Sequence, residues 1–290
     1  MKRLLPPLIV LIALIVIYSV YRDNPEAQKK EAGPTVKIVY VEWSSSTASA
    51  NVCKAVIEEE LGYKCELTPV SAAAMFQSLS SGDQDAMTCC WLPTTHKNYY
   101  NKVKDEVIRL GPNLKGTRIG LVVPEYVDMS SIADLKLHTD KLNAEIVGID
   151  PGAGVMQRTE EAMKAYGLDN YKLVEGSGAT MTAALKGAIE QERWLVVTGW
   201  TPHWKWARWD LKYLHDPKKI YGEPGKIYTL TRLGLKEDMP EVYSFFVNFK
   251  WTPDQMQQVM AMNREEGAKP AETARKWVEN HPDVVDDWLK

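Results

Sequence analysis

The densest aromatic segment of the chain, residues 199–209, reads GWTPHWKWARW and is rich in tryptophan. The full sequence has ten tryptophans but only four phenylalanines. An indole ring supplies an N–H donor and an electron-rich face, and phenylalanine lacks the first and is weaker in the second. This choice of aromatic residue indicates a role beyond hydrophobic packing.

Three tryptophans stand where predicted strands end. The apolar runs VKIVYVEW, DAMTCCW and RWLVVTGW each predict a buried strand, and they end at Trp43, Trp91 and Trp200. In open α/β sheets, ligands bind outside the carboxyl ends of the strands. Three indoles facing one space form an aromatic cage, which suits a quaternary ammonium ion because that ion has no N–H to donate. The sequence therefore predicts a site for a methylated cation.

A second feature of the sequence suits an anion. The segment DPGAGVM, residues 150–156, places a glycine turn directly before a predicted helix. Free backbone N–H groups at a helix N-terminus bind anions, and the absence of nearby Lys or Arg favours a carboxylate over a polyphosphate. His96, five residues after Trp91, could donate a hydrogen bond to the same carboxylate. Together, cage and anion site are complementary to a zwitterion such as a betaine.

The elements that must position these residues occur twice in the same order. Each copy has a buried strand, a loop, a helix, a strand, a helix and a strand that ends in tryptophan. In the first copy we expect SSSTASA to be the loop and NVCKAVIEEELGY the helix; in the second, PGAG is the loop. The second helices of the copies begin at Ser71 and Ser177. This alternation predicts two α/β lobes with parallel strands covered on both faces.

The two ends of the chain have other signals. Thr252, followed by proline and then by glutamine at the third helical position, predicts a capped helix, and Pro270 begins another. We expect these C-terminal helices to pack on the first lobe. At the other end, Lys2 and Arg3 precede an apolar run over residues 4–20, which predicts an uncleaved membrane anchor or a cleaved signal. The body would then be exported.

Four cysteines are compatible with an oxidising compartment. Cys53 lies on a predicted helix and Cys65 on the next predicted strand, so a disulfide between them is geometrically plausible. Cys89 and Cys90 are adjacent, and we expect them to form no structural pair. There is no C-x-x-C and no histidine pair at metal spacing, so neither a metal nor a cofactor is predicted.

Composition excludes some classes of function. A formal net charge of −3 and a pI near 6.0 argue against a nucleic-acid partner. A catalytic Cys–His pair would need Cys90 beside His96 or His203 with a lowered thiol pKa, and adjacent cysteines at a buried strand indicate packing instead. We therefore expect a binding protein and not an enzyme, and a monomer.

The motifs VEWSSSTASANV, WLPTTHKNYY, GPNLKGTRIGLVVPEYVD, DPGAGVM and VTGWTPHW resemble those of the glycine betaine/proline betaine substrate-binding proteins of ABC importers. The resemblance runs from about residue 36 into the C-terminal helices. It implies a type II periplasmic-binding-protein fold with a hinge of two crossing strands. It further implies a periplasmic protein that passes its ligand to a membrane permease and an ATPase.

The resemblance also assigns roles and boundaries. Trp43, Trp91 and Trp200 would form the cage, and the backbone of Gly154 and Val155 would hold the carboxylate together with His96. The expected division of the chain is a signal or anchor (1–22), a linker (23–34), lobe I (35–123 and 227–290) and lobe II (124–226).

Two departures from the family pattern leave the identity of the ligand open. Cys89 and Cys90 precede Trp91 where small residues are usual, and Glu42 stands beside Trp43. A negative charge near the cage would favour choline over a zwitterionic betaine. A choline- or carnitine-specific binding protein, or a sensory ectodomain for the same ligands, therefore remains an alternative to a glycine betaine importer component.

Overall fold

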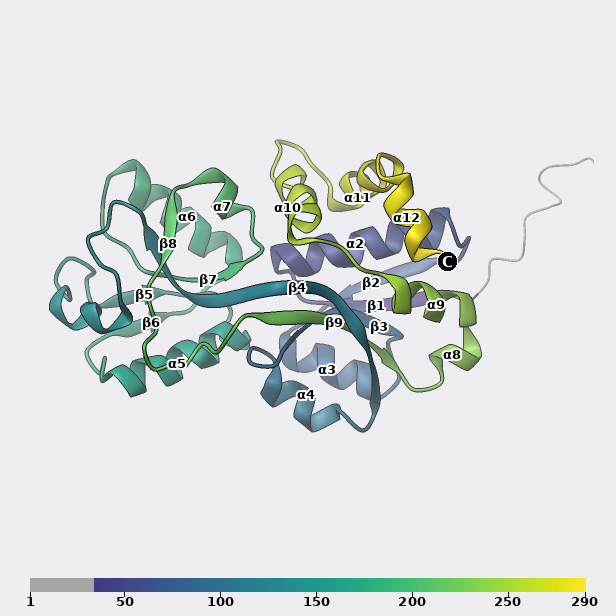
Figure 1. Cartoon of the computed structure of the whole chain (residues 1–290), viewed down its shortest axis with the longest axis horizontal. Helices are drawn as coiled ribbons and strands as arrows, with labels where there is room; N and C mark the ends of the chain where they lie inside the picture. Colours follow the sequence, from purple (N-terminus) through teal and green to yellow (C-terminus); the bar gives the residue numbers. More distant parts are fainter. Residues whose placement is uncertain (1–33) are drawn as a thin grey trace, which may run out of the picture.

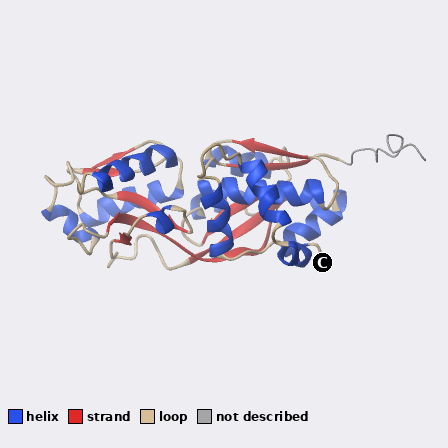
Figure 2. Cartoon of the chain, turned by 90° about the horizontal axis from the view of Figure 1, so that it is seen from above, coloured by secondary structure: helices blue, strands red, loops and turns tan. Residues whose placement is uncertain are grey.

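The computed structural model describes residues 34–290, which form two α/β lobes side by side along the long axis (Figures 1 and 2). Lobe I contains β1 (Val36–Tyr40), β2 (Cys65–Pro69), β3 (Ala86–Leu92) and β9 (Gly225–Arg232). Its helices α2 (Ser44–Glu59), α3 (Ala72–Ser80) and α4 (Lys97–Val103) cover both faces of the sheet (Figure 1). β3 is buried along its whole length, as expected for a central strand.

Lobe II contains β5 (Glu145–Val147), β6 (Lys172–Val174), β7 (Val197–Thr201) and β8 (Leu211–Tyr213). Its helices are α5 (Gly154–Tyr166), α6 (Gly178–Glu190), the short α7 (Lys205–Arg208) and the 3₁₀ helix η1 (Ile132–Leu137). α5 lies on one side of this sheet, and α6 and α7 lie on the other (Figure 1). The C-terminal ends of β5 and β7 lie towards lobe I.

The internal repeat predicted from the sequence is confirmed. β1 lies between β2 and β3 in parallel pairing, and β5 lies between β6 and β7 in the same arrangement. Ser71 and Ser177 are the N-caps of α3 and α6, and each side chain accepts a backbone N–H from the third helical residue. The two lobes therefore present matching strand ends to the space between them.

One long strand, β4 (Val107–Pro124), belongs to both sheets. Up to Thr117 it pairs antiparallel with β9 of lobe I, and from Arg118 it pairs with β7 of lobe II. β4 and β9 run side by side across the middle of the molecule (Figure 1). The lobes are thus joined through two neighbouring strands, an arrangement that can bend without breaking either sheet.

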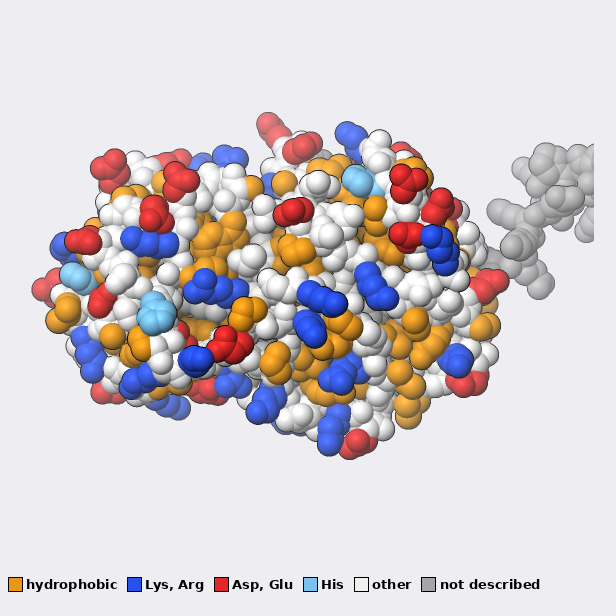
Figure 3. All heavy atoms as spheres, viewed as in Figure 1, with side chains coloured by type: hydrophobic (Ala, Val, Ile, Leu, Met, Phe, Trp, Pro, Cys, Tyr) orange, Lys and Arg blue, Asp and Glu red, His pale blue; other side chains and the backbone are white. Residues whose placement is uncertain are grey.

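The C-terminal segment is helical and packs on lobe I, as predicted. It comprises α8 (Leu235–Asp238), α9 (Pro240–Asn248), α10 (Pro253–Met262), α11 (Pro270–Glu279) and α12 (Pro282–Trp288). Thr252 forms the predicted capping box with Gln255. α10 and α11 contact α2, while α9 contacts β4. Charged side chains of both signs are spread over the face of the molecule shown in Figure 3.

The expected loop SSSTASA is wrong: these residues are the first two turns of α2, which begins at Ser44. Serine is a weak helix former, so local propensity favoured a loop. Tertiary contacts override it, because Ser46 donates to the Cys89 sulfur (2.9 Å) and Ser49 donates to the Thr88 hydroxyl (2.8 Å) in the buried helix–strand interface. Small side chains let α2 approach β3 closely there.

The plausible disulfide between Cys53 and Cys65 is not formed: all four cysteines are free and buried. Burial raises the pKa of the Cys65 thiol to about 12 and that of Cys89 to about 11. The expected N-terminal segment (1–22) and nearly all of the expected linker (23–34) lie outside the described residues. Among residues 34–290, no helix is both long and apolar enough to cross a membrane.

Free, buried thiols lead to a direct prediction. Unfolding the purified protein without reductant should release four thiols to a thiol-specific dye, whereas the folded protein should react slowly because thiolates form rarely when the pKa is raised by burial. The melting temperature should not change on addition of dithiothreitol. Release of only two thiols from the unfolded, unreduced chain would instead mean a disulfide.

Candidate functional site

A cavity lies between the two lobes and contains about 340 Å³ of space free of protein atoms, part of it open to solvent. All six residues predicted from the sequence line it: Trp43, Trp91, His96, Gly154, Val155 and Trp200. Five further residues line the cavity and were not predicted from the sequence: Ser45, Thr95, Ile119, Ile149 and Ala153. Thr95 and Ala153 adjoin predicted residues, so their loops could have suggested them, whereas Ile119 comes from the hinge strand and carries no such signal.

The three tryptophans come from corresponding parts of the two lobes. Trp43 is the N-cap residue of α2, just after β1, while Trp91 lies near the end of β3 and Trp200 near the end of β7. Trp91 pairs with a residue of β9, and Trp200 pairs with Ile119 of β4, so both indoles flank the hinge strands. All three side chains are less than a tenth exposed. The sheet edges therefore hold three indoles around one space.

His96 is held as a neutral hydrogen-bond donor. Its Nδ1 accepts the backbone N–H of Trp91 at 3.1 Å, and its ring stacks on that of Trp43 with centroids 5.5 Å apart. Burial lowers the pKa of the imidazole to about 4. A neutral imidazole whose Nδ1 accepts a hydrogen bond must have its proton on Nε2. The remaining Nε2–H can be donated to a ligand in the cavity.

The first turn of α5 offers two further donors. α5 begins at Gly154, and its N-cap residue Ala153 makes no side-chain cap, so the N–H groups of Gly154 and Val155 have no hydrogen-bond partner in residues 34–290. A side chain at position 154 would place its Cβ 2.1 Å from the Thr95 carbonyl oxygen. Glycine is therefore required where the loops of the two lobes meet.

The lining of the cavity includes no Asp, Glu, Lys or Arg side chain. Glu42 is exposed and does not line this cavity; it lines a neighbouring cavity beside α10 that shares Trp200 with the central one. Neither Cys89 nor Cys90 lines the central cavity, and burial raises the pKa of both thiols, which makes them poor nucleophiles.

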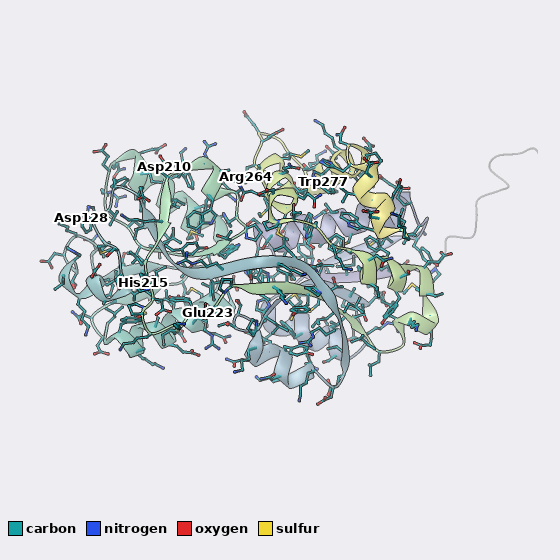
Figure 4. All side chains as sticks on the ribbon, viewed as in Figure 1. Asp128, Asp210, His215, Glu223, Arg264 and Trp277 are labelled. Atoms are coloured by element: carbon teal, nitrogen blue, oxygen red, sulfur yellow. The ribbon has the colours of Figure 1, made fainter. Side chains whose placement is uncertain are left out.

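The lobes touch on both sides of the cavity. On one side the Trp43 indole donates to Asp150 (2.7 Å), and the Tyr99 hydroxyl donates to the Gly152 carbonyl (2.8 Å). On the other side Arg264, just after α10, lies over the Trp204 ring at 5.0 Å and occupies the part of lobe I that faces lobe II (Figure 4). These contacts describe a closed arrangement of the two lobes.

A buried lysine lies next to Trp200. Lys205 is fully buried, and its Nζ makes one hydrogen bond, to the Thr198 carbonyl at 3.3 Å. Burial lowers the pKa of this amine to about 7. Its Nζ lies 5.2 Å from the centroid of the Trp200 ring. No pattern in the sequence predicted the burial of this lysine, and Lys is almost always exposed.

Comparison with known proteins agrees with this geometry. The chain is 46% identical over 151 residues to the glycine betaine/carnitine transport binding protein of Listeria monocytogenes, an alignment that covers 51% of this chain and spans about half the length of that relative. It is 40% identical to the glycine betaine, L-proline-binding protein of Borrelia burgdorferi, with a TM-score of 0.86 and coverage of 89% and 97% of the two chains.

A lactococcal protein in its closed form with glycine betaine is 42% identical, with a TM-score of 0.84 and coverage of 88% and 99% of the two chains. These likenesses identify the two-lobed architecture as a periplasmic-binding-protein fold. Residues 34–280 match the family described as the substrate-binding domain of ABC-type glycine betaine transport systems. Family match, fold and cavity agree, and the chain belongs to that family of substrate-binding domains.

Proposed function

We propose that this protein captures glycine betaine, or a closely related quaternary ammonium solute, between its two lobes and delivers it to the permease and ATPase of an ABC importer. The observation that carries the proposal is one cavity in which three indoles face two free backbone N–H groups and a neutral histidine donor. The fold, family and relatives support the same reading.

The trimethylammonium group is assigned to Trp43, Trp91 and Trp200. An onium ion cannot donate a hydrogen bond through nitrogen, so a carboxylate partner would gain only Coulomb energy while losing its own hydration. Each indole face contributes about 0.5–2 kcal/mol without that penalty. The carboxylate of the ligand is assigned to the N–H groups of Gly154 and Val155 and to His96 Nε2–H, at the positive end of α5.

The lining favours a zwitterion over choline. With no acidic side chain in the cavity, a bare cation would leave the donors on α5 and His96 unpaired, whereas a betaine carboxylate satisfies them. The lactococcal relative is closed around glycine betaine, which supports the same assignment. Carnitine shares both charged groups but is longer, and a choline- or carnitine-specific protein is the second candidate.

Capture requires movement of the lobes. The ligand would touch Trp43, Trp91 and His96 on one wall and Gly154, Val155 and Trp200 on the other, so it stabilises the closed form over the open one. β4 and the chain entering β9 act as the hinge. The proposed division remains lobe I at residues 35–123 and 227–290 and lobe II at residues 124–226. The first boundary between them falls within β4, which changes from pairing with β9 to pairing with β7 between Thr117 and Arg118.

The type II fold assigned by resemblance belongs to this proposal, as does export to the periplasm. Residues 4–20 would direct export and either remain as an anchor or be removed as a signal. We assign the chain no catalytic activity and a monomeric state. A sensory ectodomain would bind the same ligands, and genes for a permease and an ATPase beside this one would favour import.

Replacing Trp91 by alanine tests the cage. The variant should bind glycine betaine about 10-fold more weakly or worse, because one cation–π face and its apolar contact are lost. Isothermal titration calorimetry measures the affinity. Trp194, which packs on His138 outside the cavity, provides the matched control, and Trp194→Ala should bind as the wild type does. Unchanged binding by a folded Trp91→Ala protein would refute the cage.

Replacing His96 by alanine tests the carboxylate assignment. Loss of one hydrogen bond to a charged group costs about 1.5–3 kcal/mol, so the glycine betaine affinity should fall at least 10-fold. Choline has no carboxylate, and its weaker affinity should change much less. Competition titrations with the two ligands measure the ratio. Equal losses for both would place His96 at the ammonium end or in a purely structural role.

Neutral His96 also predicts a dependence of stability on pH. The imidazole takes up a proton near pH 6.5 when unfolded but only near pH 4 when folded. The unfolded state therefore binds more protons between these values, and His96 removes about 3 kcal/mol of the unfolding free energy as pH falls through this window. In urea unfolding, the free energy of unfolding of His96→Asn should fall less steeply between pH 6.5 and pH 4 than that of the wild type. An equal fall in both proteins would contradict a neutral, buried His96.

A further inference from the structure

The hydrogen bond from Trp43 Nε1 to Asp150 Oδ2, 2.7 Å long, joins residues 107 positions apart. Trp43 lies three residues beyond the end of β1, and Asp150 lies three residues beyond the end of β5. The two residues therefore occupy matching places in the two copies of the fold, one in each lobe. This is the one polar contact among the described residues that connects a cage indole to the opposite lobe by its side chain.

Asp150 is the acidic partner in this hydrogen bond. The neighbouring interlobe contacts, Tyr99 with the Gly152 carbonyl and Gln157 with the Tyr99 hydroxyl, are between neutral groups. No ion pair within residues 34–290 involves Asp150. The carboxylate is half-buried, and the indole N–H of Trp43 is its side-chain hydrogen-bond donor.

We propose that Asp150 is a positioning residue for ligand capture: it holds Trp43 in the cage wall only when the lobes are closed, and thereby couples binding of the cation to closure. The inference rests on the proposed function and deepens it. The sequence pattern predicted no role for the Asp150 side chain, because only the backbone of the DPGAGVM segment was expected to bind the ligand.

Two physical effects act together here. First, a hydrogen bond to an ionised acceptor is about twice as strong as a neutral one, and it orients the indole plane that the ammonium must face. Second, a carboxylate that accepts from the pyrrole N–H polarises the ring and makes its face more negative, which strengthens the attraction for a cation. Both effects require closure, because the donor and the acceptor belong to different lobes.

The same bond makes opening costly once ligand is present. In the open form, water can hydrate both the indole N–H and the carboxylate, so neither group is left unsatisfied. In the closed form the bond and the ligand both constrain Trp43. A ligand that prefers the constrained indole then shifts the lobes towards closure, and closure in turn raises the affinity, by the reciprocity of linked equilibria.

A double-mutant cycle tests the coupling. Trp43→Phe removes the N–H but keeps an aromatic face, Asp150→Ala removes the acceptor, and the third variant combines the two. Asp150→Ala should weaken glycine betaine binding about 10-fold in the wild-type background, the effect of one charge-assisted hydrogen bond, and less than about 2-fold in the Trp43→Phe background. Equal fold-changes in both backgrounds would overturn the proposal.

Kinetics and charge provide readouts that a structural role would not change. Stopped-flow tryptophan fluorescence should show faster ligand dissociation for Asp150→Asn with little change in association, because the bond forms after encounter. The matched control is Asp128→Asn, which removes an equal charge from an exposed aspartate at the far end of lobe II (Figure 4). A dissociation rate equal to that of the wild type in Asp150→Asn would overturn the role of the charge.

Failure of this inference can be told from failure of the proposed function. If the wild type binds glycine betaine and Trp91→Ala weakens it while Asp150→Ala does not, only the role of Asp150 is wrong. If the folded wild type binds none of the methylated ligands, the proposed function itself is wrong. Thermal unfolding without ligand should give all four proteins of the cycle similar melting temperatures, which excludes misfolding as the cause of weaker binding.

Discussion

A permanently methylated cation offers no hydrogen-bond donor, and this constraint accounts for most of the site. Such an ion is held by electron-rich faces, and several faces are needed because each contributes little. Trp43, Trp91 and Trp200 supply them at the ends of three strands. No single sheet edge surrounds a ligand, so the faces are divided between two lobes that close on each other.

The internal repeat provides the two lobes that such a site requires. Each lobe uses the same strand order, with its first strand between the other two, so equivalent loops meet across the cavity. The first loop of lobe I contributes an indole, whereas that of lobe II contributes the free N–H groups of Gly154 and Val155. One topology thus provides for the cationic end of the ligand in one place and for its anionic end in another.

Neutral groups carry the recognition inside the cavity, and charged groups act around its rim. His96 stays neutral because burial lowers its pKa, which preserves the Nε2–H donor and costs stability in acid. Asp150 and Arg264 lie outside the lining, where each joins the lobes through a tryptophan: Asp150 accepts from Trp43, and Arg264 covers Trp204. Excluding fixed charges from the cavity favours a zwitterion, since the ligand brings both charges itself.

The sequence alone determined the order of strands and helices within the two repeats and the helical nature of the C-terminal segment, because hydrophobic periodicity and the Ser71, Ser177 and Thr252 caps are local signals. It also named six lining residues, because strand-end loops are where such sheets bind ligands and because a known family shares those motifs. Only the tertiary structure decided that α2 begins at Ser44, that Glu42 does not line the cavity and that Asp150 meets Trp43. These outcomes depend on side chains distant in sequence whose contacts outweigh local propensity, and no local pattern encodes such contacts.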